Sequence, residues 1–235
     1  MESRPRTILG IFVRHPVAGL VKTRLAAELG GNRAAEIYSA FIADITDRFR
    51  GISAERTLCF CPDAAESRRH FETIAGPDYQ LWPQPQVDLG TRMQRFFEDH
   101  VRGAGDRAVL IGSDSPTLPL ALVQQAFTTL AEADCVLGPA TDGGFYLIGM
   151  RSRPWPVFSG IEWSTARVLD QTVGRIHDCR ARLALLPPWY DVDSPEDLRM
   201  LVGHLQALAK AGSPINVSAT RRALRLDTEN GDETL

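Results

Sequence analysis

The chain has 235 residues, of which 44% are hydrophobic and 23% are charged, and its formal net charge is −3 at pH 7. This composition excludes a disordered chain, a collagen-like fibre and a bundle of membrane helices, and the length is sufficient for a sizeable hydrophobic core. Nucleic-acid-binding domains are usually basic, so the slightly acidic balance argues against that class. We therefore expect neither nucleic acid as a partner nor insertion into a membrane.

The charges are unevenly distributed along the chain. Five cations and no acids lie between residues 3 and 27, and four acids and no bases follow residue 226. Without that acidic end the chain has 26 cations and 25 acids. We predict one domain over residues 1–226 and a disordered acidic tail over residues 227–235. The basic N-terminal stretch suits a small anionic ligand, and a merely solvated terminus is the alternative.

Four cysteines in a chain of this length do not form a disulfide framework, and they predict buried thiols in a reducing cytosol. No segment approaches the roughly 20 apolar residues that a membrane helix needs. A cytoplasmic location follows as the expectation. The sequence leaves the oligomeric state undecided, with a homodimer open.

Strand and helix patterns alternate from end to end. Strands are expected at residues 8–13, 57–61, 79–82, 108–112, 135–137, 145–150 and 182–186. Helices are expected at residues 32–51, 66–74, 91–101 and 120–130, after residue 164, and at 195–208. Repeated β-α-β units predict a three-layer α/β/α sandwich with a mostly parallel, Rossmann-like sheet. Ligands of such sheets bind beyond the carboxyl ends of the strands, so we searched the loops that follow them.

Two motifs follow predicted strands in the first half of the chain. Arg14-His-Pro-Val-Ala-Gly19-Leu-Val-Lys22-Thr-Arg24 combines a glycine loop with a helix start that carries cations, and this arrangement suits a phosphate. An ordinary loop with exposed cations fits the same residues. Asp114 ends the clearest strand and suits a divalent metal or a ribose hydroxyl, unless it only caps the helix near residue 119.

Two further motifs lie in the second half. Asp142-Gly143-Gly144 lets the backbone approach a ligand closely, although the same residues also suit a hairpin turn. In an extended segment Asp191 and Asp193 would face the same side and could share a cation with Asp114. The alternative is that Asp193 or Ser194 only caps a helix. The aromatic segment 158–163 is expected to pack in the core rather than border an acceptor pocket.

Five motifs in order resemble a known group. They are Pro-Val-Ala-Gly-x-x-Lys-Thr-Arg-Leu, Asp-Leu-Gly-x-Arg-Met, Gly-Ser-Asp-Ser-Pro-x-Leu-Pro, Asp-Gly-Gly-Phe-Tyr-Leu-Ile-Gly and Asp-Val-Asp-Ser-Pro-Glu-Asp-Leu. Across about residues 7–205 the chain resembles the small bacterial GT-A-fold transferases, which include glycosyltransferases associated with radical-SAM proteins and with arsenosugar biosynthesis. That group is similar to the guanylyltransferases of phospholactate and molybdopterin. The resemblance implies a nucleotide-diphospho-sugar transferase fold.

The resemblance also implies roles for individual residues. Nucleotide binding falls to Arg14, Gly19, Lys22, Arg24, Arg92 and Asp114. Lys22 and Arg24 would also act in catalysis, and Asp142 would be the general base. Mg²⁺ or Mn²⁺ would bind Asp114 and Asp193, with Asp191 as a further candidate. Gly143, Gly144 and Tyr146 would border the acceptor or sugar. Gly112 stands where the group's Asp-x-Asp motif has its first acid.

These inferences predict a metal-dependent transferase that moves a sugar from a nucleotide sugar to a small acceptor. The first alternative is a nucleotidyltransferase that joins a nucleoside triphosphate to a phosphorylated small molecule and releases pyrophosphate. The second is a nucleotide-binding regulatory module without turnover, which the missing acid at Gly112 favours.

Overall fold

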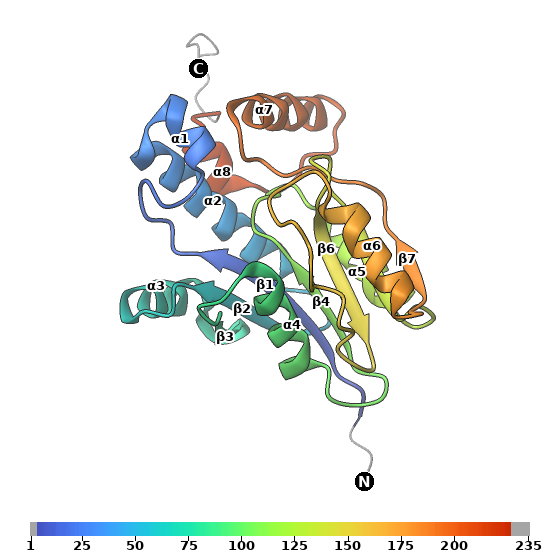
Figure 1. Cartoon of the computed structure of the whole chain (residues 1–235). Coiled ribbons are helices and arrows are strands. Elements are labelled where there is room, and N and C mark those ends of the chain that lie inside the picture. The colour runs from blue at the N-terminus through green and yellow to red at the C-terminus, as the bar shows by residue number, and fades with distance from the viewer. Residues whose placement is uncertain (1–3, 227–235) are drawn as a thin grey trace.

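The computed structural model describes residues 4–226, and the predicted tail at residues 227–235 lies outside that part. Seven strands of the described chain form one sheet (Figure 1). They are β1 (Thr7–Arg14), β2 (Glu55–Cys61), β3 (Gln80–Pro83), β4 (Arg107–Ile111), β5 (Cys135–Pro139), β6 (Phe145–Arg151) and β7 (Leu183–Leu185). Their order is β3-β2-β1-β4-β6-β5-β7, and β6 runs antiparallel to both its neighbours. The prediction of a mostly parallel sheet is confirmed.

Helices cover both faces of this sheet, which confirms the three-layer sandwich. They are α1 (Thr23–Leu29), α2 (Gly31–Phe49), α3 (Ala65–Ala75), α4 (Leu89–His100), α5 (Leu120–Thr129), α6 (Val168–Asp178), α7 (Pro195–Lys210) and α8 (Ser218–Ala223), with the 3-10 turn η1 (Gly76–Asp78). One hydrophobic cluster joins the sheet to α1, α2, α3, α5, α7 and α8, and a second joins the other face to α4 and α6. None of the helices between residues 4 and 226 is both long and apolar enough to cross a membrane.

The helix expected directly after residue 164 begins only at Val168. The preceding segment packs against the loop between β5 and β6, where the N–H of Leu169 donates to the carbonyl of Gly143 over 2.9 Å. Gly143 has a φ of +89°, and a Cβ there would lie 2.4 Å from the carbonyl oxygen of Ala166. This close approach of two backbones, which only glycine permits, delays the start of α6.

Strand β1 shows how alternation divides the core between the two layers. Leu9, Ile11 and Val13 belong to the larger cluster, whereas Ile8 belongs to the cluster beneath α4 and α6. Gly10 points to the side of α4, where a Cβ would lie 2.4 Å from Cζ of the fully buried Phe96. The missing side chain therefore makes room for the Phe96 ring.

Replacing Gly10 with alanine is expected to lower the free energy of unfolding by about 1–3 kcal/mol, because the new methyl group overpacks a closely filled core. Gly203 in α7 is the matched control, since nothing lies within 4 Å of its Cβ position. Gly203→Ala should raise the free energy of unfolding by up to about 1 kcal/mol through better helix propensity. Urea denaturation measures both changes. Equal stability of the Gly10→Ala and wild-type proteins would contradict the packing argument.

Candidate active site

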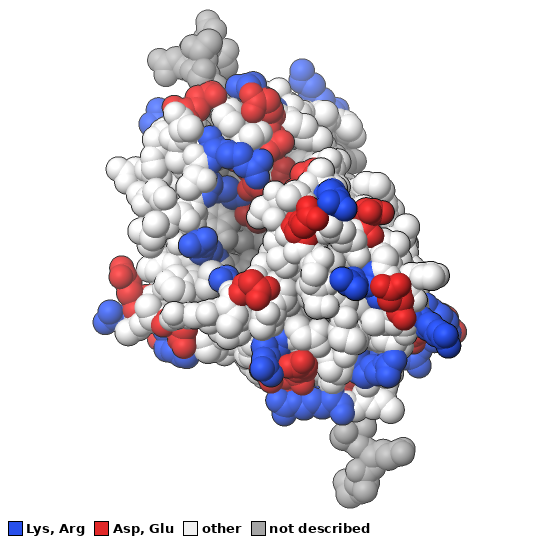
Figure 2. All heavy atoms as spheres, in the orientation of Figure 1, with Lys and Arg blue, Asp and Glu red and all other residues white. Residues whose placement is uncertain are grey.

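A cleft of about 610 Å³ opens at the carboxyl ends of β1 and β4. The chain leaves β1 toward β2 and β3 on one side and returns to β4 on the other, so the strand order reverses between β1 and β4. Ligand sites of open α/β sheets form at this point. The end of β1, the end of β4, the start of β6 and segments 163–168 and 191–193 contribute to the lining. Figure 2 shows a hollow with charged side chains of both signs along its rim.

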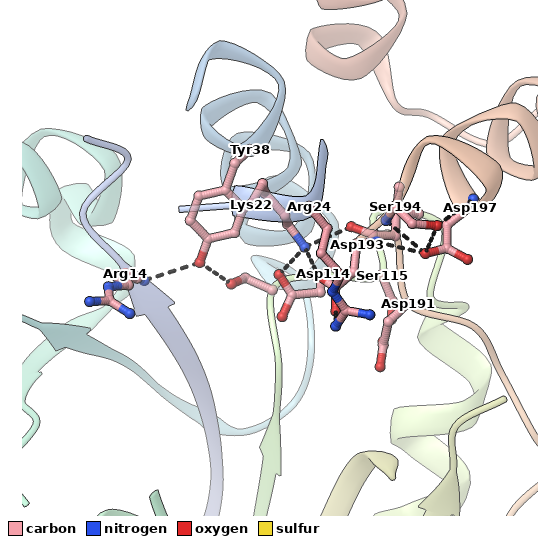
Figure 3. Close-up of polar contacts among 12 residues, drawn as sticks. Arg14, Lys22, Arg24, Tyr38, Asp114, Ser115, Asp191, Asp193, Ser194 and Asp197 are labelled. Atoms are coloured by element: carbon pink, nitrogen blue, oxygen red, sulfur yellow. Dashed lines mark hydrogen bonds and ion pairs between the residues drawn. The ribbon is translucent and has the colours of Figure 1, made fainter. Parts of the chain in front are cut away.

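Lys22 binds two of the predicted carboxylates at the edge of this cleft. Its ammonium donates to Asp114 Oδ1 at 2.5 Å, to Asp193 Oδ1 at 2.7 Å and to the carbonyl of Val192 at 2.7 Å (Figure 3). The Lys22 side chain is only 3% exposed, whereas those of Asp114 and Asp193 are 41% and 34% exposed. An ammonium has three donors, and all three are used. Lys22 therefore serves as a buried counter-ion, and it is not among the residues that line the cleft.

The charge of Lys22 is maintained despite its burial. Burial alone would lower the pKa of the ammonium, but the charges of Asp114 and Asp193 and their hydrogen bonds raise the pKa above its usual value. The ammonium also lies 5.4 Å from the ring centre of Tyr38, which is within cation–π range. The Tyr38 hydroxyl in turn lies 2.8 Å from Ser113 Oγ and accepts the backbone N–H of Arg14 at 3.1 Å. This chain of contacts links α2 to the ends of β1 and β4.

Asp191 and Asp193 have different surroundings although both line the cleft. Ser115 Oγ donates to Asp191, and Figure 3 shows the Asp191 carboxylate pointing away from Lys22. Burial first, and then repulsion from Asp114, raises the pKa of Asp191 to about 7. In contrast, Lys22 holds the pKa of Asp193 below its usual value against the opposing effect of burial. Near pH 7 the Asp191 carboxylate therefore holds a proton in a large share of the molecules.

The residues after Asp193 hold this segment in place. Ser194 is the N-cap of α7 and forms a capping box with Asp197, as the Ser-Pro-Glu-Asp sequence predicted. The N–H of Val192 donates to the carbonyl of Asp114 over 2.9 Å, which fixes the segment beside the end of β4. Asp193 is not the cap, and Asp114 does not cap α5, whose N-cap is Pro119 without a side-chain bond. The capping alternatives for both aspartates are therefore wrong.

The loop between β5 and β6 supplies the opposite side of the cleft. Asp142 and Gly144 line it, and the Asp142 carboxylate accepts the N–H of Gly144 at 2.8 Å. Tyr146 also lines it, with its hydroxyl donating to the carbonyl of Pro187 at 3.0 Å and its pKa raised to about 12 by burial. Gly143 does not reach the cleft but packs against Ala166, which does. The alternative of a hairpin connection is confirmed, because β5 and β6 pair antiparallel.

The predicted cations lie at different distances from the carboxylates. Arg14 and Arg24 line the cleft, and Arg24 Nη2 lies 3.5 Å from Asp193 Oδ2. Arg92 is not part of the lining; its Nε donates to the carbonyl of Val87, and its Nη1 lies 4.0 Å from Cys61 Sγ. Gly19, with a φ of +78°, lies in the exposed loop before α1 and also stays outside the lining. The cleft therefore combines two arginines with four aspartates.

Sequence reasoning missed two parts of the site. Tyr38 has a detectable signal, since it lies one helical turn before Phe41 and Ile42 on the apolar face of α2, where a buried hydroxyl needs a partner. Trp163 was expected in the core together with Phe158. Phe158 is buried there, and Trp163 packs against the same cluster but also lines the cleft.

The chain is similar to one family of bacterial proteins and to several solved structures. The chain matches the family described as "Uncharacterized protein conserved in bacteria (DUF2064)" over residues 47–165. A search of curated proteins found no match. A crystal structure from Desulfovibrio desulfuricans G20, provisionally named a nucleotide-diphospho-sugar transferase, is 35% identical with a TM-score of 0.83, and the alignment covers 95% of this chain and 96% of that one.

More distant structures share the fold. The inositol-1-phosphate CTP transferase of T. maritima is 15% identical with a TM-score of 0.55, and the alignment covers 92% of this chain and 100% of that one. A cytidylyltransferase from Leptospira borgpetersenii serovar Hardjo-bovis is 12% identical with a TM-score of 0.56, covering 89% and 96%. At these identities the likeness concerns the fold alone. The family match and the 35% identical structure together show that the chain belongs to the DUF2064 family.

Proposed function

We propose that this protein transfers a sugar from a nucleotide sugar to the hydroxyl group of a small acceptor. The observation that carries the proposal is the position of Arg14, Arg24, Asp114 and Asp191 around one cleft at the reversal of strand order. Arginine side chains bind diphosphates through charge-assisted hydrogen bonds. The name of the 35% identical structure, a nucleotide-diphospho-sugar transferase, supports the same class of donor.

The cleft fits a divalent cation as part of this proposal. Asp114 and Asp191 supply carboxylate oxygens, which Mg²⁺ and Mn²⁺ prefer, and a bound cation would favour the ionised form of Asp191 against its burial and the charge of Asp114. Among residues 4–226 no three His, Cys, Asp or Glu side chains gather into a protein-only metal site. Phosphate oxygens and water would complete the shell, as is usual for Mg²⁺. Asp193 is the less suitable ligand because Lys22 and Arg24 bind both of its oxygens, whereas Lys22 binds only one oxygen of Asp114.

The residues of the cleft divide the chemistry between them. Arg14 and Arg24 bind the diphosphate and stabilise the negative charge that develops on the departing nucleoside diphosphate. A bound metal would supply further stabilisation of that charge. Asp142 accepts the proton of the acceptor hydroxyl. At the same time the hydroxyl oxygen forms a bond to the anomeric carbon of the sugar, and the bond from that carbon to the diphosphate breaks. Lys22 keeps Asp114 in place beside the reacting groups.

Nucleotide binding tests the role of the arginines. Arg24→Ala is expected to weaken the binding of UDP or GDP about 10- to 100-fold, since each charge-assisted bond to phosphate contributes about 1.5–3 kcal/mol. Isothermal titration in Mg²⁺ measures the loss. Arg69→Ala is the matched control, because Arg69 is an exposed arginine on α3 that does not line the cleft. Unchanged affinity of the Arg24 variant would contradict the proposed phosphate site.

Product analysis separates the proposed reaction from its alternatives. Glycosyl transfer releases a nucleoside diphosphate, whereas nucleotidyl transfer consumes a triphosphate and releases pyrophosphate. A panel of nucleotide sugars and triphosphates, assayed for both products, decides between them. The regulatory module would be favoured if nucleotide binds tightly but no donor gives either product, not even by slow hydrolysis.

A further inference from the structure

The cleft changes character between its edge and its depth. The charged residues all lie at the carboxyl edge of the sheet or in the loops around it. Deeper in, on the side of α4 and α6, the lining is mainly apolar: Phe12, Met93, Leu110, Phe145, Ile148 and Trp163. All six belong to, or pack against, the hydrophobic cluster of that face.

Three neighbouring strands build the floor of this apolar part. Leu110 of β4 pairs directly with Ile148 of β6, and Phe12 comes from β1, which is paired with β4 on its other side. Met93 of α4 and Trp163 also contribute to the lining, and the Trp163 ring packs against α4 at Gly90, where a Cβ would lie 2.8 Å from Trp163 Cζ2. Leu89 of α4, 41% exposed, lies on the rim. The apolar part of the cleft, called the recess below, therefore continues directly from the charged edge.

Resting on the proposed function, we infer that the acceptor is an alcohol or phenol whose body is hydrocarbon, and that this body occupies the apolar part of the cleft. Asp142, the proposed base, lies three residues before Phe145, at the boundary between the two parts. A hydroxyl group that reaches Asp142 places the carbon skeleton behind it next to Phe145, Ile148 and Leu110. The donor diphosphate stays at Arg14 and Arg24.

The other parts of the substrates fit this recess less well. The side chains of its floor, Phe12, Leu110 and Ile148, carry no hydrogen-bonding group. The hydroxyls of a sugar or the polar edge of a nucleobase would lose their bonds to water there without replacement, which disfavours burial. A hydrocarbon loses nothing polar and gains from leaving water.

Methionine methyl groups provide a local probe. The chain has four methionines, of which Met93 lies in the recess and Met200 is exposed on α7. Protein labelled with ¹³C at methionine methyl groups would be titrated with the primary alcohols from butanol to octanol. We expect a saturable shift of the Met93 signal, an affinity that rises about fourfold with each methylene, and no saturable shift at Met200. 1,6-Hexanediol should bind at least several-fold more weakly than 1-hexanol, because its second hydroxyl would be buried.

Variants and a competition experiment complete the test. Leu89→Ser should weaken hexanol binding several-fold, whereas Leu185→Ser, at an exposed leucine on β7 outside the cleft, should leave it unchanged. Saturating UDP or GDP should not displace hexanol. A Met93 signal that does not move, or hexanol that the nucleotide displaces, overturns the inference. Neither result depends on the Arg24 titration, so failure of the phosphate site and failure of the apolar site are separable.

Discussion

Replacing Asp114 with asparagine is expected to abolish the stimulation of nucleotide binding by Mn²⁺ and to lower turnover at least about 100-fold. Asp114 Oδ1 is held by Lys22, while 41% of the side chain stays exposed at the cleft. An amide retains an oxygen that can accept from Lys22, so the local structure should persist, but it lacks the negative charge that makes a carboxylate a strong ligand of a divalent cation. Loss of a preorganised electrostatic group costs about 10²–10³ in rate.

Asp142→Asn is the matched control for this substitution, because it changes a second cleft-lining carboxylate in the same way. Titration calorimetry with and without Mn²⁺ should show normal metal-promoted nucleotide binding in the Asp142 variant. Its turnover should nevertheless fall by about 10²–10⁴, as expected on loss of a general base. If Asp114→Asn binds nucleotide with undiminished dependence on Mn²⁺, then Asp114 is not a metal ligand and the assignment of the site is wrong.

The sheet edge could be predicted from the sequence because it depends on local signals. The apolar runs of β1 and β4 are followed by polar residues or glycine, so Arg14 and Asp114 could be assigned to strand ends without knowledge of the packing. Parallel strands then bring their carboxyl ends to one edge. The same reasoning placed Ser194 at the start of α7.

The partners of Lys22 could not be predicted in this way. Asp114 and Asp193 lie 92 and 171 residues from it along the chain, and only tertiary packing decides whether the ammonium turns inward to them or outward to a ligand. The left-handed conformation of Lys22 at the start of α1 carries no sequence signal either. The motif predicts that Lys22 binds phosphate. In the structure Lys22 binds Asp114 and Asp193 instead, which indicates a counter-ion.

The apolar recess could not be predicted from the sequence for a different reason. Phe12, Leu110 and Ile148 have the alternation of any buried strand, and residues of the same type line a core or a recess. What distinguishes them is the open cleft beside them, which depends on how α4 and the segment before α6 lie across the sheet. The same ambiguity applies to Trp163, which packs against the core cluster and also lines the cleft.

Replacing Lys22 with methionine is expected to lower the free energy of unfolding by about 2 kcal/mol. Removing one partner of a fully buried ion pair costs about 3–5 kcal/mol, but Asp114 and Asp193 are partly exposed here, so water can solvate the carboxylates that are left. Methionine has a similar length and fits the apolar contacts with Tyr38 and Phe41. Lys210, the other lysine of the chain, lies exposed at the end of α7, and Lys210→Met should change stability by less than about 0.5 kcal/mol in urea denaturation.

Ligand binding distinguishes a counter-ion from a phosphate ligand at position 22. If Lys22 is a counter-ion, its removal frees the carboxylates of Asp193 and Asp114. The Lys22→Met variant should then bind Mn²⁺ about tenfold more tightly than the wild-type protein in calorimetric titration. The same variant should bind nucleotide more weakly without metal, because the uncompensated carboxylates repel the diphosphate. Added Mn²⁺ should recover most of that loss, since the metal replaces the missing positive charge. A phosphate ligand predicts the opposite pattern, in which metal affinity stays unchanged and nucleotide affinity falls equally with and without Mn²⁺.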